Sequence, residues 1–293
     1  MKVTMALFDH IRPLLPKKFR EKPVIIPTVR MSGPILYGQG FRPTLSIATV
    51  AEPLRKAFSI KEAPAVAIVV NSPGGSPVQA HLIFKRIRAL ADESNKKVIV
   101  AVEDVAASGG YMIAVAGDEI IADPCSIVGS IGVISAGFGF TGLIEKLGIE
   151  RRVYTAGRNK MILDPFQPEK DDDIDYLKSI QLEIHEMFIA LVKSRRGEVI
   201  NATEEDVFSG RFFTGETGQS LGLVDRIGDL RSIVRERYGD KAKLKIITTG
   251  GGLFRRSSAG VMMENGLDAI GAGFADRLFT QAEARAHWAR YGL

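Results

Sequence analysis

Cysteine is almost absent from this chain, with one residue in 293. A single cysteine excludes a disulfide framework and a cysteine-ligated zinc site, and it is typical of a reducing compartment. Histidine is scarce as well, and none lies between residues 82 and 184. We expect all four histidines to be surface or packing residues rather than catalytic partners: His10, His81, His185 and His287. With 45% hydrophobic and 25% charged residues, the composition is that of a globular protein with a sizeable core.

Most of the chain has no net charge. Of the 39 basic and 34 acidic residues, 7 basic and 2 acidic ones lie in residues 1–30, which leaves 32 of each sign in the remainder. The net charge of +5 therefore belongs to an N-terminal arm, and the neutral body argues against nucleic-acid binding. The arm has apolar residues at helical spacing, such as Leu7 and Ile11. It is either an amphipathic segment that contacts an anionic membrane or a solvated terminus.

A secretory signal is also lacking, because residues 1–22 are charged throughout and Pro13 and Pro16 interrupt the place of an apolar run. The longest uncharged stretch, residues 124–144, is long enough to span a bilayer but contains five glycines. We expect this stretch to form buried strand and loop rather than a lipid-exposed helix.

Short apolar runs alternate with longer amphipathic segments. Residues 65–71 and 97–103 are typical of buried parallel strands. Residues 76–93 between them, and residues 47–58 before them, place apolar side chains on one helical face. This order predicts an α/β domain with helices packed on a parallel sheet.

The strongest helical pattern begins at Pro168 and ends before Gly197. Three aspartates at its start, residues 171–173, and basic residues at its end match the preferences of helix dipoles and caps. We therefore interpret the three aspartates as a helix start rather than a metal site. A last strand is predicted at residues 244–248.

Residues 71–76 read Asn-Ser-Pro-Gly-Gly-Ser and connect a predicted strand to a predicted helix. The glycines let the backbone approach a ligand, and amides at a helix start suit a negative charge. Neither the dinucleotide-binding nor the Walker pattern is present. Alone, this loop is either a tight turn or an anion site.

Ser108 stands at the same kind of junction, in Ala-Ala-Ser-Gly-Gly-Tyr at residues 106–111. It is either a helix N-cap or a nucleophile whose following amide stabilises an oxyanion. A nucleophilic serine needs a base, and a lysine can serve where burial lowers its pKa. Lys160 is a candidate because three apolar residues follow it and favour partial burial, although its position alone does not separate it from a solvated lysine.

Together, these segments resemble the serine peptidase family of signal peptide peptidase A, in its half-length form with one catalytic domain. The resemblance runs from about residue 24 to residue 228. It rests on Pro34-Ile35 after a first strand, Ser-Pro-Gly-Gly at 72–75, Ala-Ser-Gly-Gly-Tyr at 107–111, Gly-Ser-Ile-Gly-Val at 129–133, Lys160, Gly-Arg-Phe-Phe-Thr-Gly at 210–215 and Leu-Gly-Leu-Val-Asp at 221–225.

The resemblance implies a role for each matching residue. Ser108 is the nucleophile, Lys160 is the general base, and Ser130 holds the lysine by a hydrogen bond. The amides of Gly75 and Gly109 form the oxyanion hole. The implied fold is α/β and similar to Clp protease and crotonase, a spiral of ββα units with a parallel sheet flanked by helices. The family further implies peptide substrates (signal peptides and unfolded segments), no cofactor, and homo-oligomeric rings whose sites are completed by neighbouring subunits.

The chain departs from the family pattern in three places. Asn71 stands where an acidic residue is usual, and Met112 replaces a common second tyrosine; neither belongs to the implied chemistry. The family's N-terminal membrane anchor is missing, so we expect a cytoplasmic protein whose basic arm contacts the inner face of the membrane. The expected organisation is an arm at residues 1–30, a catalytic domain at 31–249 and a partly helical tail at 250–293.

Two other functions stay open beside a serine endopeptidase that works through an acyl-enzyme. A crotonase-type enzyme acting on acyl-coenzyme A shares the two-amide oxyanion hole, but it has no use for a nucleophilic serine paired with Lys160. The other function is that of a catalytically silent, membrane-associated scaffold of the same fold. The presence of Ser108, Ser130 and Lys160 together argues against it, because a scaffold does not need them.

Overall fold

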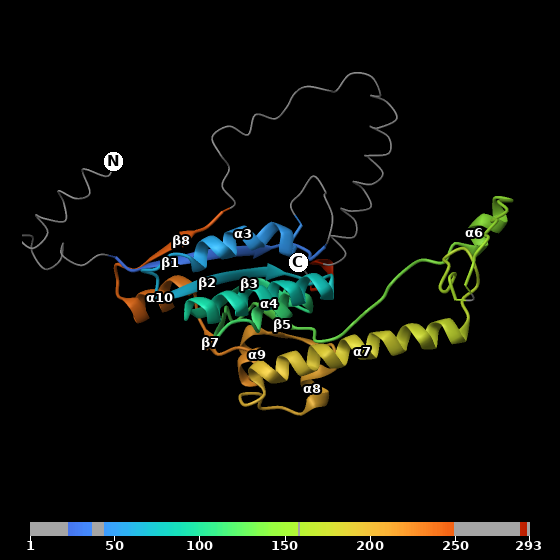
Figure 1. The fold of residues 1–293 in the computed structure, drawn as a ribbon. Coiled ribbons are helices and arrows are strands. Elements are labelled where there is room, and N and C mark those ends of the chain that lie inside the picture. The colour runs from blue at the N-terminus through green and yellow to red at the C-terminus, as the bar shows by residue number, and fades with distance from the viewer. Residues whose placement is uncertain (1–22, 37–43, 158, 249–287, 292–293) are drawn as a thin grey trace, which may run out of the picture.

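A computed structural model describes residues 23–36, 44–157, 159–248 and 288–291. These residues form an α/β fold in which helices flank a sheet of eight strands (Figure 1). The strands are β1 (Ile25–Ser32), β2 (Ala65–Ser72), β3 (Lys97–Ala107), β4 (Glu119–Ala122), β5 (Ile127–Gly129), β6 (Phe212–Thr214), β7 (Arg226–Ile227) and β8 (Lys243–Ile246). The helices are α3 (Ile47–Phe58), α4 (Pro77–Ser94), α5 (Gly109–Ala114), α6 (Thr141–Lys146), α7 (Asp171–Arg196), α8 (Glu204–Phe208), α9 (Gly215–Ser220) and α10 (Leu230–Tyr238).

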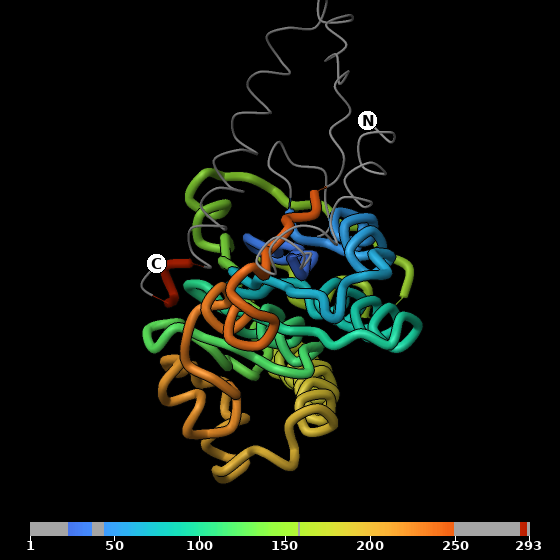
Figure 2. Tube along the Cα trace, turned by 90° about the vertical axis from the view of Figure 1, so that its left-hand side faces the viewer, coloured from blue at the N-terminus to red at the C-terminus, as the bar shows by residue number. Residues whose placement is uncertain are grey.

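The sheet has the strand order β6-β5-β3-β2-β1-β8, and β4 and β7 continue from the first half of β3. The β5–β6 pair is antiparallel, and the other pairs are parallel. Both Figure 1 and Figure 2 show β1 and β8 on one side of the molecule and α7, α8 and α9 on the opposite side. Because β2, β3 and β5 are parallel neighbours, their carboxyl ends meet at one edge of the sheet.

The central prediction of alternating strands and helices is confirmed. The runs at 65–71 and 97–103 form β2 and β3, and residues 47–58 and 76–93 form α3 and α4 within a residue or two. β3 continues to Ala107, beyond its predicted end. Asp104 fits in this extension because its carboxylate accepts a hydrogen bond from Asn71 of β2, and the adjacent Glu103 pairs with Arg30 of β1, across β2.

The two faces of β2 carry side chains of different size. Val66, Ile68 and Val70 of β2 contribute to the larger core, which includes α3, α4 and α5. Ala65 and Ala67 point to the opposite face, where the apolar side of α10 packs. Burial on both faces explains why β2 is a continuous apolar run rather than an alternating one.

Helix α7 has the predicted acidic first turn and basic last turn, and only its second half packs on the body. His185, Phe188 and Val192 contact or enter the core there. The preceding stretch from Asp171 to His185 is roughly 20 Å long at 1.5 Å per residue. Together with residues 133–170 it forms an extension, here called the projection (residues 133–184), that leads away from the body in Figure 1.

The expectation that residues 124–144 are buried is wrong for their second half. β5 and Ile131 are buried, but the chain then leaves the sheet. Ile134 is 65% exposed and Phe138 is 81% exposed within this single copy. The apolar composition of this stretch therefore does not come from packing within its own chain.

The N-terminal boundary differs from the expected one, because residues 25–30 belong to β1 rather than to the basic arm. Residues 1–22, most of the tail at 250–293, His10 and His287 lie outside the described residues. None of the described helices is long and apolar enough to cross a membrane.

Candidate active site

Ser108 and Ser130 follow two parallel strands that end side by side. Ala107 of β3 pairs with Gly129 of β5, and the Ser108 amide donates a hydrogen bond to Gly129 O at 2.8 Å. The two serines predicted to act together are thus brought together by strand pairing alone. Ser130 is 5% exposed, whereas Ser108 is partly exposed.

Both serines have a backbone conformation that residues with a side chain rarely adopt. Each has a φ angle of 51°, in the left-handed region. Such a conformation persists where surrounding contacts impose it. The Ser130 amide donates to Arg211 O at 2.7 Å, and Ser108 O accepts from the Met112 amide at 2.9 Å. The strained turns therefore hold the two serines in fixed positions.

The N-cap interpretation of Ser108 is only half right. Ser108 occupies the N-cap position of α5, but its side chain makes no capping hydrogen bond. A capping serine accepts a hydrogen bond from an amide two or three residues later. The Ser108 hydroxyl is therefore not committed to α5, as a nucleophile requires.

The loop after β2 lies directly against Ser108, and its glycines are needed for this approach. A Cβ atom on Gly74 would lie 2.8 Å from Ser108 Cβ, and a Cβ atom on Gly110 would lie 2.3 Å from Ser72 O. A Cβ atom on Gly109 would lie 3.6 Å from the Gly75 amide nitrogen. The amides of Gly75 and Gly109 are therefore neighbours beside Ser108.

Ile35 fixes the orientation of this loop. Its amide donates to Gly74 O at 2.8 Å, and its carbonyl accepts from the Ser76 amide at 2.7 Å. Gly75, between these two bonds, has a φ angle of 134°, and a Cβ atom there would lie 2.2 Å from Ile35 O. Only glycine fits at this position, and the bridge between Ile35 and Gly75 joins the segments that follow β1 and β2.

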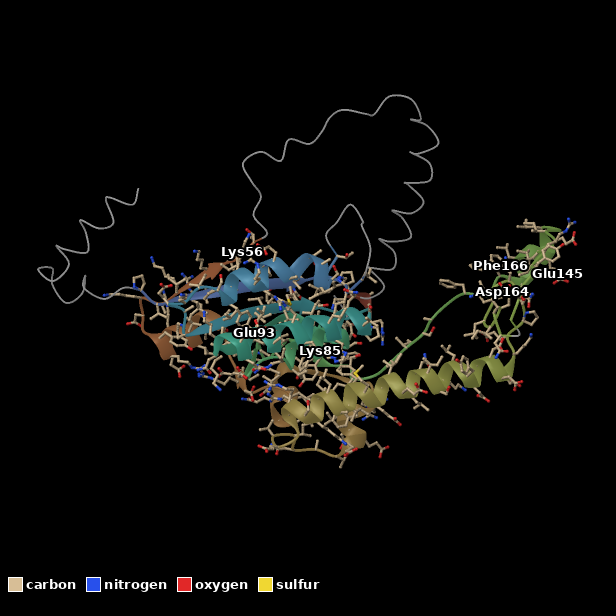
Figure 3. The ribbon with its side chains drawn as sticks, in the orientation of Figure 1. Lys56, Lys85, Glu93, Glu145, Asp164 and Phe166 are labelled. Carbon is tan, nitrogen blue, oxygen red and sulfur yellow. The ribbon has the colours of Figure 1, made fainter. Side chains whose placement is uncertain are left out.

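Lys160 is not at this site. It lies in an exposed turn of the projection, where its amide donates to Gly157 O at 3.2 Å. Figure 3 labels Asp164 and Phe166 of the same segment at the outer end of the projection, far from the body. The expected partial burial of Lys160 is wrong, because the apolar residues that follow it are themselves only half-buried.

The outer end of the projection is a small packed unit. Arg151 Nε donates to Asp164 Oδ2 at 2.9 Å, and the Arg151 guanidinium lies 4.8 Å from the centre of the Phe166 ring. The Phe140 and Phe166 rings are 5.5 Å apart. These contacts join the segment that carries Lys160 to the rest of the outer end of the projection.

The described histidines are packing residues, as predicted. His185 Nε2 lies 2.9 Å from Ile131 O, where the projection leaves the body. The His81 ring stacks on Phe84, and burial, with a smaller contribution from Lys85, lowers its pKa below the ordinary value. Neither imidazole makes a described hydrogen bond to Ser108.

Asn71, the first departure from the family pattern, links β2 to β3. Its Nδ2 donates to the Asp104 carboxylate, and its Oδ1 accepts from the Val105 amide at 3.3 Å. The pairing of β2 with β3 shifts in register between Val70 and Ser72, so the Asn71 side chain connects the two strands where their pairing is irregular. A carboxylate could not donate to Asp104, which explains why an amide fits here.

The motif at residues 221–225 is structural. Arg196 of α7 is 5% exposed, and it donates to Gly222 O at 2.7 and 2.9 Å and to the Asp225 carboxylate at 2.8 and 3.0 Å. The buried Tyr111 hydroxyl donates to Leu223 O at 2.9 Å, and burial raises its pKa well above the usual range. This network fastens α5 and α7 to the same loop.

Sequence reasoning missed Tyr291, which reaches the site from the end of the chain. It is 8% exposed, and its hydroxyl lies 3.3 Å from Ser130 Oγ and 3.4 Å from Pro73 O. The tail has no recognisable motif, so nothing in the sequence singled this residue out.

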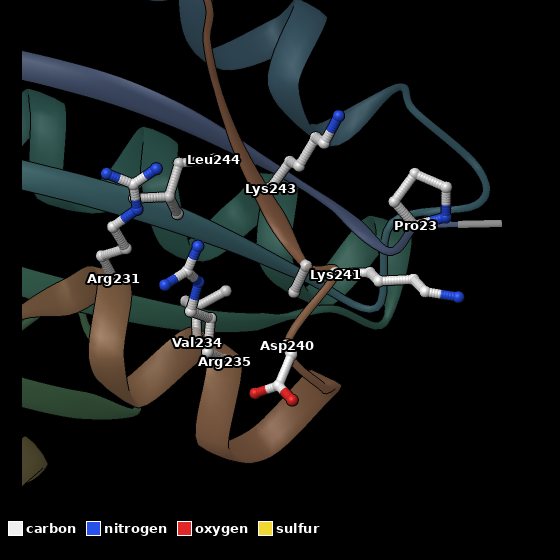
Figure 4. A pocket seen from close by; sticks show the side chains of 9 residues that line it. Pro23, Arg231, Val234, Arg235, Asp240, Lys241, Lys243 and Leu244 are labelled. Carbon is white, nitrogen blue, oxygen red and sulfur yellow. The ribbon is translucent and has the colours of Figure 1, made fainter. Parts of the chain in front are cut away.

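A separate cavity of about 600 Å³ lies between α10 and β8 (Figure 4). Arg231, Arg235, Lys243 and Asp240 are among its lining residues. Lys243 pairs with Ile25 at the start of β1, so this cavity is at the opposite edge of the sheet from Ser108. None of the predicted site residues lines it.

Comparison with known proteins identifies the family of the chain. Residues 91–245 match the model of peptidase family S49. The chain is 58% identical over 292 residues to a Brucella abortus protein named Na(+)/H(+) antiporter NhaA, covering 98% of this chain and 40% of that protein. It is 32% identical over 210 residues to the chloroplastic serine protease SPPA of Arabidopsis thaliana, covering 70% of this chain and 31% of that protein.

Among solved structures, a mutant of the 1510-N membrane-bound stomatin-specific protease matches with a TM-score of 0.50 at 19% identity. The match covers 78% of this chain and all of that one, and it supports the predicted fold class.

The chain belongs to peptidase family S49, and the resemblance to signal peptide peptidase A is confirmed. It spans 40% of the length of the two Brucella relatives and 54% of a protease from Methanocaldococcus jannaschii.

Proposed function

We propose that this chain is a serine endopeptidase that cleaves small, unfolded, apolar peptides, signal peptides among them, through an acyl-enzyme. The observation that carries this proposal is the group formed at one sheet edge by the uncommitted Ser108 hydroxyl, Ser130 and the neighbouring amides of Gly75 and Gly109. Membership of a peptidase family supports the same chemistry.

In the proposed reaction, the neutral amine of Lys160 takes the proton of Ser108 while Ser108 Oγ attacks the scissile carbonyl carbon. The amides of Gly75 and Gly109 stabilise the oxyanion that forms. The lysine ammonium then protonates the leaving amine as the peptide bond breaks. Water hydrolyses the acyl ester with the same lysine as base, which restores the Ser108 hydroxyl and releases the acid.

We propose further that Lys160 comes from a second copy of the chain. Within one copy it lies near the outer end of a projection that leads away from Ser108. The projection also exposes large apolar side chains, which an isolated surface rarely keeps uncovered. Their positions favour contact with a neighbouring subunit: Ile134, Phe138, Leu143, Leu147, Ile149, Tyr154 and Leu182. A head-to-tail contact of this kind repeated around an axis gives a ring.

Labelling with a serine-directed fluorophosphonate tests the nucleophile. We expect the wild-type chain to be labelled and to cleave an unfolded apolar peptide, and the Ser108→Ala variant to do neither. Ser59→Ala is the matched control, because Ser59 is exposed on the C-terminal side of α3 and its hydroxyl only donates to Lys56 O. Undiminished labelling of Ser108→Ala would refute the assignment.

We also propose that the basic arm contacts an anionic membrane surface, on the strength of its six basic and two acidic residues within residues 1–22, a net charge of +4. A chain that starts at residue 23 keeps β1 but loses that charge. We expect the full chain, but not the shortened one, to sediment with vesicles containing an anionic lipid in low salt. Equal sedimentation of both chains would refute a role for the arm.

A further inference from the structure

The last described residues of the chain touch the site through one side chain. Tyr291 lies at the end of a short turn, in which its amide donates to Trp288 O at 2.9 Å. The Tyr291 hydroxyl, which has one proton to donate, lies 3.3 Å from Ser130 Oγ and 3.4 Å from Pro73 O. It therefore touches both the serine expected to hold the base and the loop that carries the Gly75 amide.

Packing holds the Tyr291 ring in this position. The ring meets Phe212 of β6 edge to face, with 5.1 Å between the ring centres. Val105 and Ala107 of β3 form a small apolar cluster with it, and Ile127 and Trp288 pack against that cluster. A tyrosine ring that is buried in this way usually places its hydroxyl against a definite partner. The contact with Ser130 is therefore part of a built arrangement rather than a loose surface contact.

The hydrogen-bonding capacity of Ser130 leaves room for a second partner. A serine hydroxyl has one proton to donate and two acceptor positions. If Tyr291 donates to one acceptor position, the proton of Ser130 stays available for the neutral amine of a lysine. An oriented donor favours the uncharged amine, which is the form that can accept the proton of Ser108.

We propose that Tyr291 is a positioning residue that acts through Ser130, orienting the Ser130 hydroxyl towards the catalytic lysine. This inference rests on the proposed peptidase function. It assigns a role to the C-terminal segment, which no motif explains. Tyr291 itself touches neither the nucleophile nor the scissile bond in this arrangement.

The Tyr291→Phe variant tests this role, because it keeps the ring packed on Phe212 and removes only the hydroxyl. We expect kcat on an unfolded peptide to fall about five- to tenfold, the usual effect of one lost neutral hydrogen bond, with KM within about twofold of wild type. Tyr238→Phe is the control for loss of a tyrosine hydroxyl, since Tyr238 ends α10 at the opposite edge of the sheet. It should leave kcat and KM unchanged.

A double-mutant cycle separates action through Ser130 from a general structural effect. In a Ser130→Ala background, Tyr291→Phe should have no further effect, because the hydroxyl it orients is gone. The rate of fluorophosphonate labelling of Ser108 gives the same comparison if peptide turnover is too slow to follow. An equal loss in both backgrounds would overturn the proposal, as would wild-type turnover in Tyr291→Phe. Faster turnover in Tyr291→Phe would overturn it as well, by showing that Tyr291 competes with the lysine for Ser130.

The outcome also distinguishes this proposal from the proposed function. If Ser108 is not labelled in the wild-type chain, the peptidase assignment fails and the role of Tyr291 fails with it. If Ser108 is labelled in the wild-type and Ser59→Ala chains but not in Ser108→Ala, the peptidase assignment holds and the Tyr291 variants decide the second question alone.

Discussion

The separation of Lys160 from Ser108 leads to a mixing experiment with a definite result. The Ser108→Ala chain keeps the proposed base, Lys160, and the Lys160→Ala chain keeps the proposed nucleophile, Ser108. Each variant alone should lose at least about 100-fold in kcat/KM, the usual contribution of a general base or more. If the two groups come from neighbouring copies, a mixed assembly contains interfaces at which both are intact.

The size of the restored activity follows from random mixing. In a one-to-one mixture, half of the copies carry Ser108 and half of their neighbours carry Lys160, so about a quarter of the interfaces are complete. We expect about a quarter of the wild-type kcat per chain after the variants are co-expressed or dissociated and reassembled. Peptide cleavage is the assay, and fluorophosphonate labelling should appear on the Lys160→Ala chain only.

A matched control and a refuting result complete this test. Lys85→Ala removes an exposed lysine from α4 on the body, as Figure 3 shows, and should keep wild-type activity. Co-assembly has to be verified by capture of one tagged variant with the other. If co-assembled variants show only the sum of their residual activities, the base does not come from the neighbouring copy and the reasoning from the projection is refuted.

Three further predictions concern the framework of the site. Gly110→Ala should lower the free energy of unfolding by about 1–3 kcal/mol in urea denaturation and also slow turnover, because the added Cβ would overlap Ser72 O. Gly137→Ala is the control and should be neutral, because open space surrounds Gly137. Arg196→Met should lower the free energy of unfolding by about 2–4 kcal/mol in the same measurement, because it leaves the Asp225 carboxylate and Gly222 O without their buried partner. A decrease below about 1 kcal/mol would contradict a stabilising role for Arg196. Burial lowers the pKa of His81 below 6.5, so the unfolded chain binds the proton more readily than the folded chain. The free energy of unfolding should therefore fall as the pH drops below about 6.5, and His81→Gln should reduce that fall. An unchanged pH dependence in His81→Gln would rule out His81 as its source.

The framework of the site could be predicted because it depends on local patterns. The apolar runs of β2 and β3 and the glycine loops that follow them give strand, turn and helix in sequence order. Parallel pairing then places Ser108, Ser130 and the Gly75 loop at one edge. The strand pairing determines which of these residues lie close together. The family resemblance predicts the role of each one.

Other parts of the site could not be predicted because they depend on contacts between distant segments. The apolar residues around Lys160 suggested burial, but their environment in one copy is the surface of the projection. Tyr291 meets Ser130 across 161 positions of sequence, and no pattern near Tyr291 differs from that of an ordinary chain end. Arg30 is counted with the basic arm because of its charge, yet it belongs to β1, which pairs with β2 and β8.

The proposed division of the site between body and projection has a consequence for regulation. A nucleophile and a base on separate copies meet only when copies associate, so the fraction of complete sites depends on the concentration of the chain relative to the dissociation constant of the assembly. The Ser108 edge of a lone copy would keep its amides and serines in place, because β2, β3 and β5 hold them within one chain. Such a copy would bind peptide without cleaving it efficiently. Activity per chain should therefore rise with protein concentration while KM stays constant, whereas a base within the same chain would give activity per chain that is independent of concentration.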